Sequence, residues 1–407
     1  MTHDLVIIGA GAAGLFAAAN APSDWNTLVL EKTHTPGQKL LLTGSGQCNL
    51  TNSEPITSFL ARYGMNGKRL RPVLFPFSNL ALMSYFEQNM LPPIIREDGK
   101  VFPASMNSAD VLNLLLNLSR ERGVAFRYEA AVTRLSSAEK NGYCVQTADE
   151  VFAAKRILVA TGGASHPRTG SDGAFFACLE AFGLEIIPCR PALTPVFVQN
   201  YPYRELSGIS FSDCTIAVLP KDGGQTICAN GDLLLTHRGF SGPGMLAASR
   251  YVRQGNALRI CYLPGTQPDD LRRFLLESAS GNARQIISLL ESVTHLPRRF
   301  LEQLCCRTEI APTEKASRLS GREMGFLAEL LTADSYEISG TGGFAVAMTT
   351  AGGVNLDEID LRTMQAKRHP GIYFAGEILD VDGDTGGYNL QFAFSSAMCA
   401  VQSMSKA

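Results

Sequence analysis

The sequence lacks any block of basic residues, and its charges nearly cancel. It contains 36 Lys and Arg against 38 Asp and Glu, which gives a formal net charge of −2. Neither nucleic acid nor an acidic membrane surface is therefore an implied partner, because both recruit proteins through clustered positive charge. We expect a small-molecule substrate, and the sequence leaves the oligomeric state open.

Cys-x-x-Cys pairs and Cys/His clusters with metal-ligand spacing are also missing, so we expect no metal site. The ten cysteines lie mostly in apolar stretches, as reduced thiols do in cytosolic proteins. We therefore expect a cytoplasmic protein. A Gly-x-Ser-x-Gly motif is absent too, which argues against the nucleophile elbow of an α/β-hydrolase.

The longest early apolar stretch, Leu5 to Ala19, is shorter than the ~18 residues that a membrane span requires. Ala19-Asn20-Ala21 resembles a signal-peptidase site, but Asp4 stands where a signal peptide would carry basic residues. We expect neither a membrane span nor a signal peptide.

The same stretch has the pattern of a dinucleotide-binding unit. Leu5 to Ile8 are typical of a buried parallel strand. A Gly-x-Gly-x-x-Gly turn then leads into a helix from Ala12 to Asn20, whose N-terminus offers unpaired N–H groups to a pyrophosphate. The predicted contacts of this turn are Gly9, Gly11, Ala12, Ala13 and Gly14.

A second predicted strand, Thr27 to Leu30, ends on Glu31 and Lys32. Glu31 stands about 20 residues after Gly9, the spacing at which an acid binds the adenosine ribose. Strand, glycines, helix, strand and acid occur in the right order, so the sequence predicts a dinucleotide site that includes Glu31 and Lys32.

The next stretch, Thr35 to Asn52, has glycines and small polar residues that suit a backbone close to a ligand. Lys39 is well placed for a phosphate or ribose, and Asn49 for the reactive end of a cofactor. Cys48 is interpreted as a structural thiol rather than a redox group; a plain surface loop is the alternative for the whole stretch. The cofactor-binding residues predicted here are Gln38, Lys39, Gly44, Gly46, Cys48 and Asn49.

The domain pattern is interrupted in the middle of the chain. Residues 1–190 form the first part of the nucleotide domain and include a strand that ends on Thr161 and Gly162. Residues 191–342 lack a nucleotide signature and are predicted to be an insert, with an antiparallel barrel or sandwich over 191–265 and a mainly helical part over 266–342. Residues 343–407 then complete the nucleotide domain.

The last part contains a strand that ends on Gly376 and Glu377, a glycine–aspartate loop, and a closing helix from Leu390 to Gln402. A glycine-rich turn thus opens both the first and the last helix, so two helix N-termini can converge on one ligand. The residues predicted to contact it are Gly376, Glu377, Asp384, Gly387, Tyr388, Asn389 and Leu390.

Five segments together resemble the BaiN-like, aminoacetone-oxidase-like family of bacterial flavoproteins. They are Gly9-Ala-Gly-Ala-Ala-Gly14, Lys39-Leu-Leu-Leu-Thr-Gly-Ser-Gly-Gln-Cys-Asn49, Ala160-Thr-Gly-Gly163, Thr236-His-Arg-Gly-Phe-Ser-Gly-Pro243 and Ala375-Gly-Glu-Ile-Leu-Asp-Val-Asp-Gly-Asp-Thr-Gly-Gly-Tyr-Asn-Leu-Gln391. The resemblance implies an α/β fold in which a two-part Rossmann-like FAD-binding domain is interrupted by an insert with a β-barrel and a helical subdomain. It also implies non-covalent FAD and places Val132 against the adenine.

One departure from the family pattern concerns the second segment. The family usually has Gly-Gly-Gly-Arg-Cys-Asn, whereas this chain has Ser45 and Gln47 in place of a glycine and the arginine. Glutamine carries no charge, so any contact that the arginine would make with an anion is missing from this position.

The resemblance supports the cofactor better than the reaction, since some members oxidise amines with oxygen and others reduce enone-type substrates with NADH. We expect an FAD-dependent oxidoreductase that exchanges hydride with a small organic substrate, with NAD(P)H as a candidate transient donor. The alternatives are an oxygen-using amine oxidase and a flavin-bound sensor without turnover.

Two residues are candidates for catalysis, each with a structural alternative. His237 would transfer a proton if the insert covers the flavin, but a lone histidine is commonly a structural hydrogen-bonding group. Tyr388 would line the substrate pocket, and a packing role is the alternative.

Overall fold

A computed structural model of the chain describes residues 2–138, 142–281 and 283–406. They form two compact units. The first unit combines Met1–Ala192 with Gly343–Ala407, and the second comprises Leu193–Gly342. The predicted boundaries at 190/191 and 342/343 lie within a few residues of these divisions.

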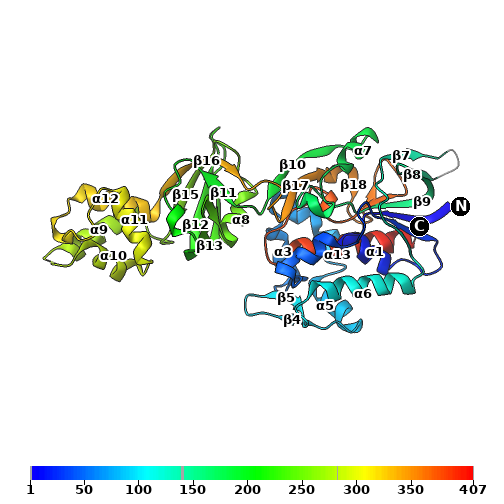
Figure 1. Ribbon diagram of the computed structural model, residues 1–407, viewed down its shortest axis with the longest axis horizontal. Helices are drawn as coiled ribbons and strands as arrows, with labels where there is room; N and C mark the ends of the chain where they lie inside the picture. The colour runs from blue at the N-terminus through cyan, green and yellow to red at the C-terminus, as the bar shows by residue number, and fades with distance from the viewer. Residues whose placement is uncertain (1, 139–141, 282, 407) are drawn as a thin grey trace. The chain divides into compact units, whose positions relative to one another are not determined.

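A nine-stranded sheet forms the centre of the first unit (Figure 1). The strands from β20 to β6 are parallel, and β18, β19, β7 and β8 extend the sheet in antiparallel pairings. The main path, in spatial order, is β18 (Ile359–Asp360), β19 (Gln365–Ala366), β20 (Ile372–Phe374), β9 (Val151–Val159), β1 (Thr2–Ile8), β2 (Thr27–Leu30) and β6 (Ala125–Arg127), with β7 (Arg134–Ser137) and β8 (Tyr143–Gln146) joined to β9.

Strand β1 occupies the middle of this sheet because its residues are apolar on both faces. Leu5 to Ile8 are almost fully buried, as a parallel strand covered on both sides requires. Helix α1 (Ala12–Ala19) follows directly and packs beside α13 (Tyr388–Met404) and α6 (Ser108–Glu121) (Figure 1). The predicted order of strand, glycine turn, helix and strand is therefore confirmed.

The other elements of the first unit surround this sheet. A three-stranded sheet in the order β3-β5-β4 and a two-stranded pair of β10 and β17 lie beside it. The bounds are α2 (Gln38–Leu42), β3 (Thr51–Asn52), α3 (Ile56–Arg62), α4 (Arg71–Leu74), α5 (Asn79–Gln88), β4 (Pro93–Ile95), β5 (Lys100–Pro103), α7 (Phe175–Ala181), β10 (Ile186–Ala192) and β17 (Thr349–Val354), with short 3₁₀ turns at Thr43–Gly46, Gly64–Leu70, Pro167–Thr169, Leu356–Glu358 and Gly376–Ile378.

The second unit contains a closed six-stranded antiparallel barrel and a set of helices. In spatial order the barrel strands are β11 (Val196–Val198), β14 (Gly239–Ser241), β13 (Ile227–Leu235), β12 (Ser210–Leu219), β15 (Ala257–Cys261) and β16 (Asp334–Thr341). The helices are α8 (Pro243–Ser249), α9 (Pro268–Ala279), α10 (Ile286–Thr294), α11 (Arg298–Arg307) and α12 (Gly321–Thr332), with 3₁₀ turns at Arg204–Leu206 and Ala316–Arg318.

Strand β16 differs from the expectation that residues 266–342 are mainly helical. It returns after four helices and closes the barrel between β15 and β11. Its pattern has period two, because Asp334, Tyr336 and Ile338 are buried while the residues between them are exposed. This alternation cannot be recognised from apolar residues alone, because the first buried position is an aspartate.

The two ends of the second unit lie side by side. The N–H of Gly342 donates to the carbonyl of Pro195 at 2.9 Å. In the first unit, the segments that lead out and back pair as β10 and β17, with Ala192 opposite Thr349. An insert into a single domain requires its exit and return segments to lie close together, and these pairings meet that requirement.

None of the helices in the described part of the chain is both long and apolar enough to cross a membrane.

A buried polar cluster joins the barrel of the second unit to helix α11. Asp334, which is 1 % exposed, accepts hydrogen bonds from the hydroxyls of three tyrosines. Arg307 forms a two-point ion pair with the same carboxylate, with N–O distances of 2.9 Å. Burial, together with nearby negative charge, raises the pKa of all three tyrosines, so their hydroxyls stay protonated and donate. The tyrosines are Tyr203, Tyr262 and Tyr336.

Replacing Arg307 by Met should destabilise the second unit by about 3 kcal/mol, because it leaves a buried carboxylate without its cation. Urea unfolding followed by near-UV circular dichroism of the tyrosines measures this change, while fluorescence of Trp25 reports the first unit. The matched control is R298M, since Arg298 forms exposed ion pairs with Glu291 and Glu302 that contribute at most about 1 kcal/mol. Equal unfolding midpoints for R307M and R298M would contradict the assignment.

Candidate cofactor site

The first unit contains a cleft of about 620 Å³ at the carboxyl ends of its parallel strands. Open α/β sheets bind ligands at this edge, because the turns into the following helices present their N–H groups there. The predicted residues that line the cleft are Gly9, Gly11, Ala12, Ala13, Glu31, Lys32, Gln38, Lys39, Val132, Thr161, Gly162, Gly376, Glu377, Asn389 and Leu390.

The three glycines after β1 have different surroundings. Gly9 has φ +100°, and a Cβ atom there would lie 2.5 Å from the carbonyl oxygen of Ala160. A Cβ atom on Gly14 would lie 1.9 Å from the carbonyl oxygen of Gly9, so this glycine lets α1 pack on the turn. A Cβ atom on Gly11 would meet no atom within 4 Å beyond its chain neighbours, and Gly11 lines the open cleft. Tight turn, close packing and ligand access are thus divided among the three positions.

The carboxylate of Glu31 is fixed at the end of β2. Oε2 accepts the N–H of Ala10, and Oε1 accepts the N–H and hydroxyl of Thr33, each at 2.8 Å. The side chain therefore stays against the glycine turn, with lone pairs left for ribose hydroxyls. Lys32 also lines the cleft, but its Nζ is bonded to Asp172 at 2.6 Å.

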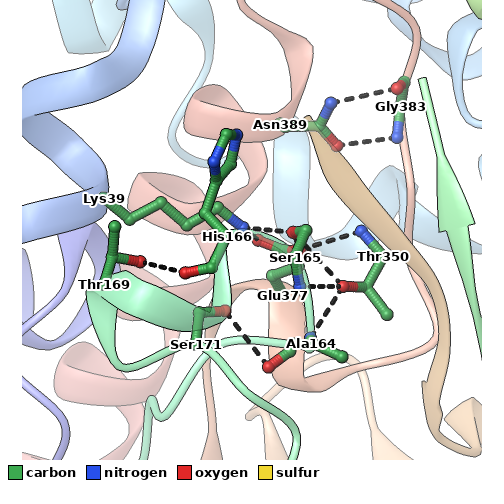
Figure 2. Close-up of polar contacts among 11 residues, drawn as sticks. Lys39, Ala164, Ser165, His166, Thr169, Ser171, Thr350, Glu377, Gly383 and Asn389 are labelled. Atoms are coloured by element: carbon green, nitrogen blue, oxygen red, sulfur yellow. Dashed lines mark hydrogen bonds and ion pairs between the residues drawn. The ribbon is translucent and has the colours of Figure 1, made fainter. Parts of the chain in front are cut away.

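A second polar group joins parts of the first unit that are far apart in sequence (Figure 2). Nζ of Lys39 lies 2.6 Å from Oε2 of Glu377 and 2.5 Å from Oγ of Ser165. The hydroxyl of Ser165 and the N–H of Thr350 both donate to Oε1 of Glu377, at 2.7 and 2.8 Å. This network holds the base of the cleft together.

Glu377 is ionised in this network. Burial acts to raise its pKa, but Lys39 and the hydrogen bonds from Ser165 and Thr350 outweigh burial, so the pKa lies below its usual value. Because the pKa of Glu377 is lower in the folded than in the unfolded chain, the ion pair with Lys39 stabilises the fold at pH values above the unfolded-state pKa. This stabilisation is lost as the pH falls through the folded-state pKa. Burial and the nearby Lys39 lower the pKa of His166, which favours a neutral imidazole.

The residues present fit a bound dinucleotide. The hydroxyls of Thr161 and Thr349 are buried at the cleft and have no hydrogen-bond partner within the described chain. Such groups are uncommon in folded proteins and point to a missing partner. The N-cap residues of α1 and α13 are Gly11 and Gly387, which have no side chain to occupy the N–H groups of the first helical turn, so these groups remain for an anion.

Several predicted cofactor residues do not line the cleft. Cys48 is fully buried, and burial raises the pKa of its thiol to about 12, which agrees with a structural role. Gly44 packs against Asn49 and Phe102 instead of facing a ligand. The complete set outside the cleft is Gly14, Gly44, Gly46, Cys48, Asn49, Asp384, Gly387 and Tyr388.

Asn49 caps the last helix in place of contacting a cofactor. In the side-chain orientation that satisfies its hydrogen bonds, the amide oxygen accepts the N–H of Gly387 at 3.0 Å. Gly387 has φ +99°, and a Cβ atom there would lie 2.4 Å from the carbonyl oxygen of Thr51. The N–H of Gly387 is thus occupied, and Asn389 and Leu390 are the residues of α13 that line the cleft. The side chain of Asn389 bonds Gly383 (Figure 2).

The two catalytic candidates have different outcomes. The ring of Tyr388 is 4 % exposed, packs on Phe59, and donates its hydroxyl to Oε1 of Glu54 at 2.7 Å. This geometry favours the packing role over a catalytic one. His237 is exposed in the turn between β13 and β14 of the second unit, and its catalytic role stays a prediction.

The sequence interpretation missed part of the cleft wall. Residues 169–178 and the segment around Met348 and Thr349 line the cleft, although neither carries a recognisable motif. The unpartnered hydroxyl of Thr349 depends on the pairing of β17 with β10, which the sequence does not reveal.

Glycine turn, acid and helix N-termini on one cleft define a Rossmann-type dinucleotide-binding protein. The chain matches the family described as HI0933-like protein Rossmann domain over residues 3–403, and it belongs to this family. It is 31% identical over 404 residues to a ribosomal RNA dihydrouridine synthase of Escherichia coli, covering 98% of both chains. It is 29% identical to a 3-dehydro-bile acid delta(4,6)-reductase of Clostridium scindens, covering 97% of both.

A solved structure shares the fold. The 3-ketosteroid delta1-dehydrogenase from Sterolibacterium denitrificans superposes with a TM-score of 0.52 at 11% identity, covering 100% of this chain and 99% of that chain. The resemblance to BaiN-like flavoproteins is confirmed. The family and the named relatives indicate an FAD-dependent oxidoreductase.

Replacing Glu31 by Ala should weaken FAD binding roughly 10- to 150-fold, since it removes charge-assisted hydrogen bonds to ribose worth about 1.5–3 kcal/mol. E31Q should lie between E31A and the wild type, because the amide keeps one acceptor oxygen. Quenching of FAD fluorescence in a titration of the apoprotein measures the affinity. E121A, an exposed change on α6, serves as the control, and an unchanged affinity in E31A would refute the assignment.

Joining Ala192 to Gly343 by a short Gly/Ser linker should leave a protein that folds and binds FAD but loses turnover. The reason is that all residues lining the cleft belong to the first unit, whose exit and return strands are already paired. Circular dichroism and FAD titration check the first expectation, and a turnover assay checks the second. A linker variant that does not fold would show that the first unit is not an independent domain.

Proposed function

We propose that this chain is a reductase that adds two hydrogens to a carbon–carbon double bond conjugated with a carbonyl group, and that its substrate is uridine in RNA. The observation that supports this proposal is that the similarity between this chain and the two named relatives extends over 97–98% of the chain. Dihydrouridine is uridine with a saturated ring double bond, and the second name also describes reduction of double bonds. The shared chemistry supports a reductase.

When bound, FAD supplies hydride chemistry, and the chain's residues bind and orient it. The turn at Gly9 and Gly11 and the N-terminus of α1 would hold the pyrophosphate, and Glu31 the adenosine ribose. Thr161 and Thr349 would donate or accept hydrogen bonds with their unpartnered hydroxyls.

The N-terminus of α13 contributes a positive dipole end near Asn389 and Leu390, where developing negative charge would be stabilised. Lys39 lies between Glu377 and Ser165 and bonds both, which orders this wall of the cleft. The proposed proton donor stays His237 of the second unit, because imidazoles are common acid–base groups in enzymes.

The balanced reaction requires NADH or NADPH as electron donor. The ring C5=C6 bond of uridine becomes a single bond, new C–H bonds form at both carbons, and NAD(P)H and one proton are consumed. All ten cysteines are free thiols, which supports a reducing compartment and hence the cytoplasm. An RNA substrate departs from the expectation, drawn from the net charge, that no nucleic acid is involved.

The test is an anaerobic reaction of FAD-loaded protein with NADH or NADPH and oligouridylate. A mass gain of two hydrogens per converted uridine is the expected result, and E31A at the same protein concentration is the matched control. Free uridine in a parallel reaction shows whether the polymer is required. Conversion of aminoacetone with oxygen and release of hydrogen peroxide would instead identify the amine oxidase, and no redox response to any donor would identify the sensor.

A further inference from the structure

An arginine from another part of the first unit lies beside the loop that has Gln47 in place of the family arginine. Nη2 of Arg96, in the turn between β4 and β5, donates to Oε1 of Gln47 at 2.7 Å. The guanidinium also lies over the ring of Phe102, with its central carbon 4.1 Å from the ring centroid. A positive charge therefore sits beside Gln47, although residue 47 itself is neutral.

The main chain of Arg96 is also fixed. The backbone N–H of Arg96 donates to the carbonyl of Lys100, and the carbonyl of Arg96 accepts the N–H of Gly99, so two hydrogen bonds of 2.9 Å close the turn. The edge of Phe102 in turn lies against Gly44 of the loop. Ordering the side chain before a ligand arrives lowers the entropic cost of binding.

Arg96 forms no ion pair within the part of the chain that the structure describes, although its charge acts on the nearby Asp98. The neighbouring Lys100 forms an ion pair with Asp98 at 2.6 Å, and Arg62 pairs with Glu54 at 3.1 Å. No carboxylate of the residues that the structure describes lies within ion-pair distance of Arg96, and the side chain is exposed. Four of its five N–H donors remain for an external anion.

The loop connects this charge to the cofactor cleft. It begins at Thr43, which lines the cleft, and the N–H of Cys48 donates back to the carbonyl of Thr43 at 2.9 Å. It ends at Asn49, which caps the helix whose next residues line the cleft. A substrate group bound at Arg96 would thus be positioned by the same loop that borders the cofactor.

We propose that Arg96 binds a backbone phosphate of the RNA substrate next to the target uridine. This inference rests on the proposed function, because it takes RNA as the substrate. An arginine fork matches the geometry of phosphate oxygens, and the neutral Gln47 orients the fork without cancelling its charge. The proposal also reconciles an RNA substrate with a chain that has no basic block, since a single ordered cation is enough to bind one phosphate.

The experiment measures binding of fluorescent oligouridylate to FAD-loaded protein by anisotropy between 50 and 200 mM salt, the range over which phosphate contacts weaken strongly. R96Q should bind roughly tenfold more weakly, because one charge-assisted contact is lost. The slope of log affinity against log salt should become less negative by about 0.7, the value for one phosphate on a single strand. Flavin absorbance confirms equal FAD occupancy.

R71Q is the matched control, since Arg71 is also exposed and lies over a phenylalanine ring, Phe75, at 4.9 Å. It should bind oligouridylate like the wild type. In the double variant Q47R/R96Q the guanidinium returns on the loop itself, and the wild-type salt slope is expected to return with it.

The outcomes separate the two proposals. A wild type that binds and reduces oligouridylate, with R96Q equal to it in affinity and salt slope, overturns the role of Arg96 and leaves the proposed function intact. A wild type that neither binds nor reduces oligouridylate overturns both. Loss in R96Q without loss in R71Q supports the phosphate assignment.

Discussion

The site depends on the position of strand β9 between β1 and β20. Residues 157–159 pair in parallel with Val6–Ile8 on one edge and with Ile372–Phe374 on the other. Because the strands are parallel and in register, they end at the same level, and the turn at Gly9 meets Ala160 within the same edge. Three distant parts of the chain thereby contribute to one cleft, and a slip of one residue would turn every side chain of the slipped strand to the opposite face.

The first strand, glycine turn and helix could be predicted because each carries a local signal. The apolar run from Leu5 to Ile8 requires burial on both faces, and Glu31 follows at the spacing that a ribose contact needs. Glu31 also bonds the N–H of Ala10 in the turn, so this contact joins residues of the same local unit. Local physics was therefore sufficient for this half of the site.

The predictions that differ from the structure concern residues whose role is decided by a long-range contact. Tyr388 has the composition of a pocket residue, but Glu54 accepts its hydroxyl and turns the ring into the core. Gly387 stands at a helix N-terminus, yet Asn49 already binds its N–H. Strand β16 was missed because its first buried residue is an aspartate whose partners, Arg307 and three tyrosines, are spread over other elements.

The hydrogen bond between Gly342 and Pro195 has a consequence for assembly of the cofactor cleft. A folded second unit holds its own ends together, so β10 and β17 meet as if a short turn connected them. If that unit is unfolded, the pairing of β10 with β17 must instead close a flexible loop that spans Leu193–Gly342. The entropic free-energy cost of closing this loop is about 3 kcal/mol higher than for a short turn. Damage confined to the barrel or its helices therefore weakens the nucleotide fold without touching one of its residues.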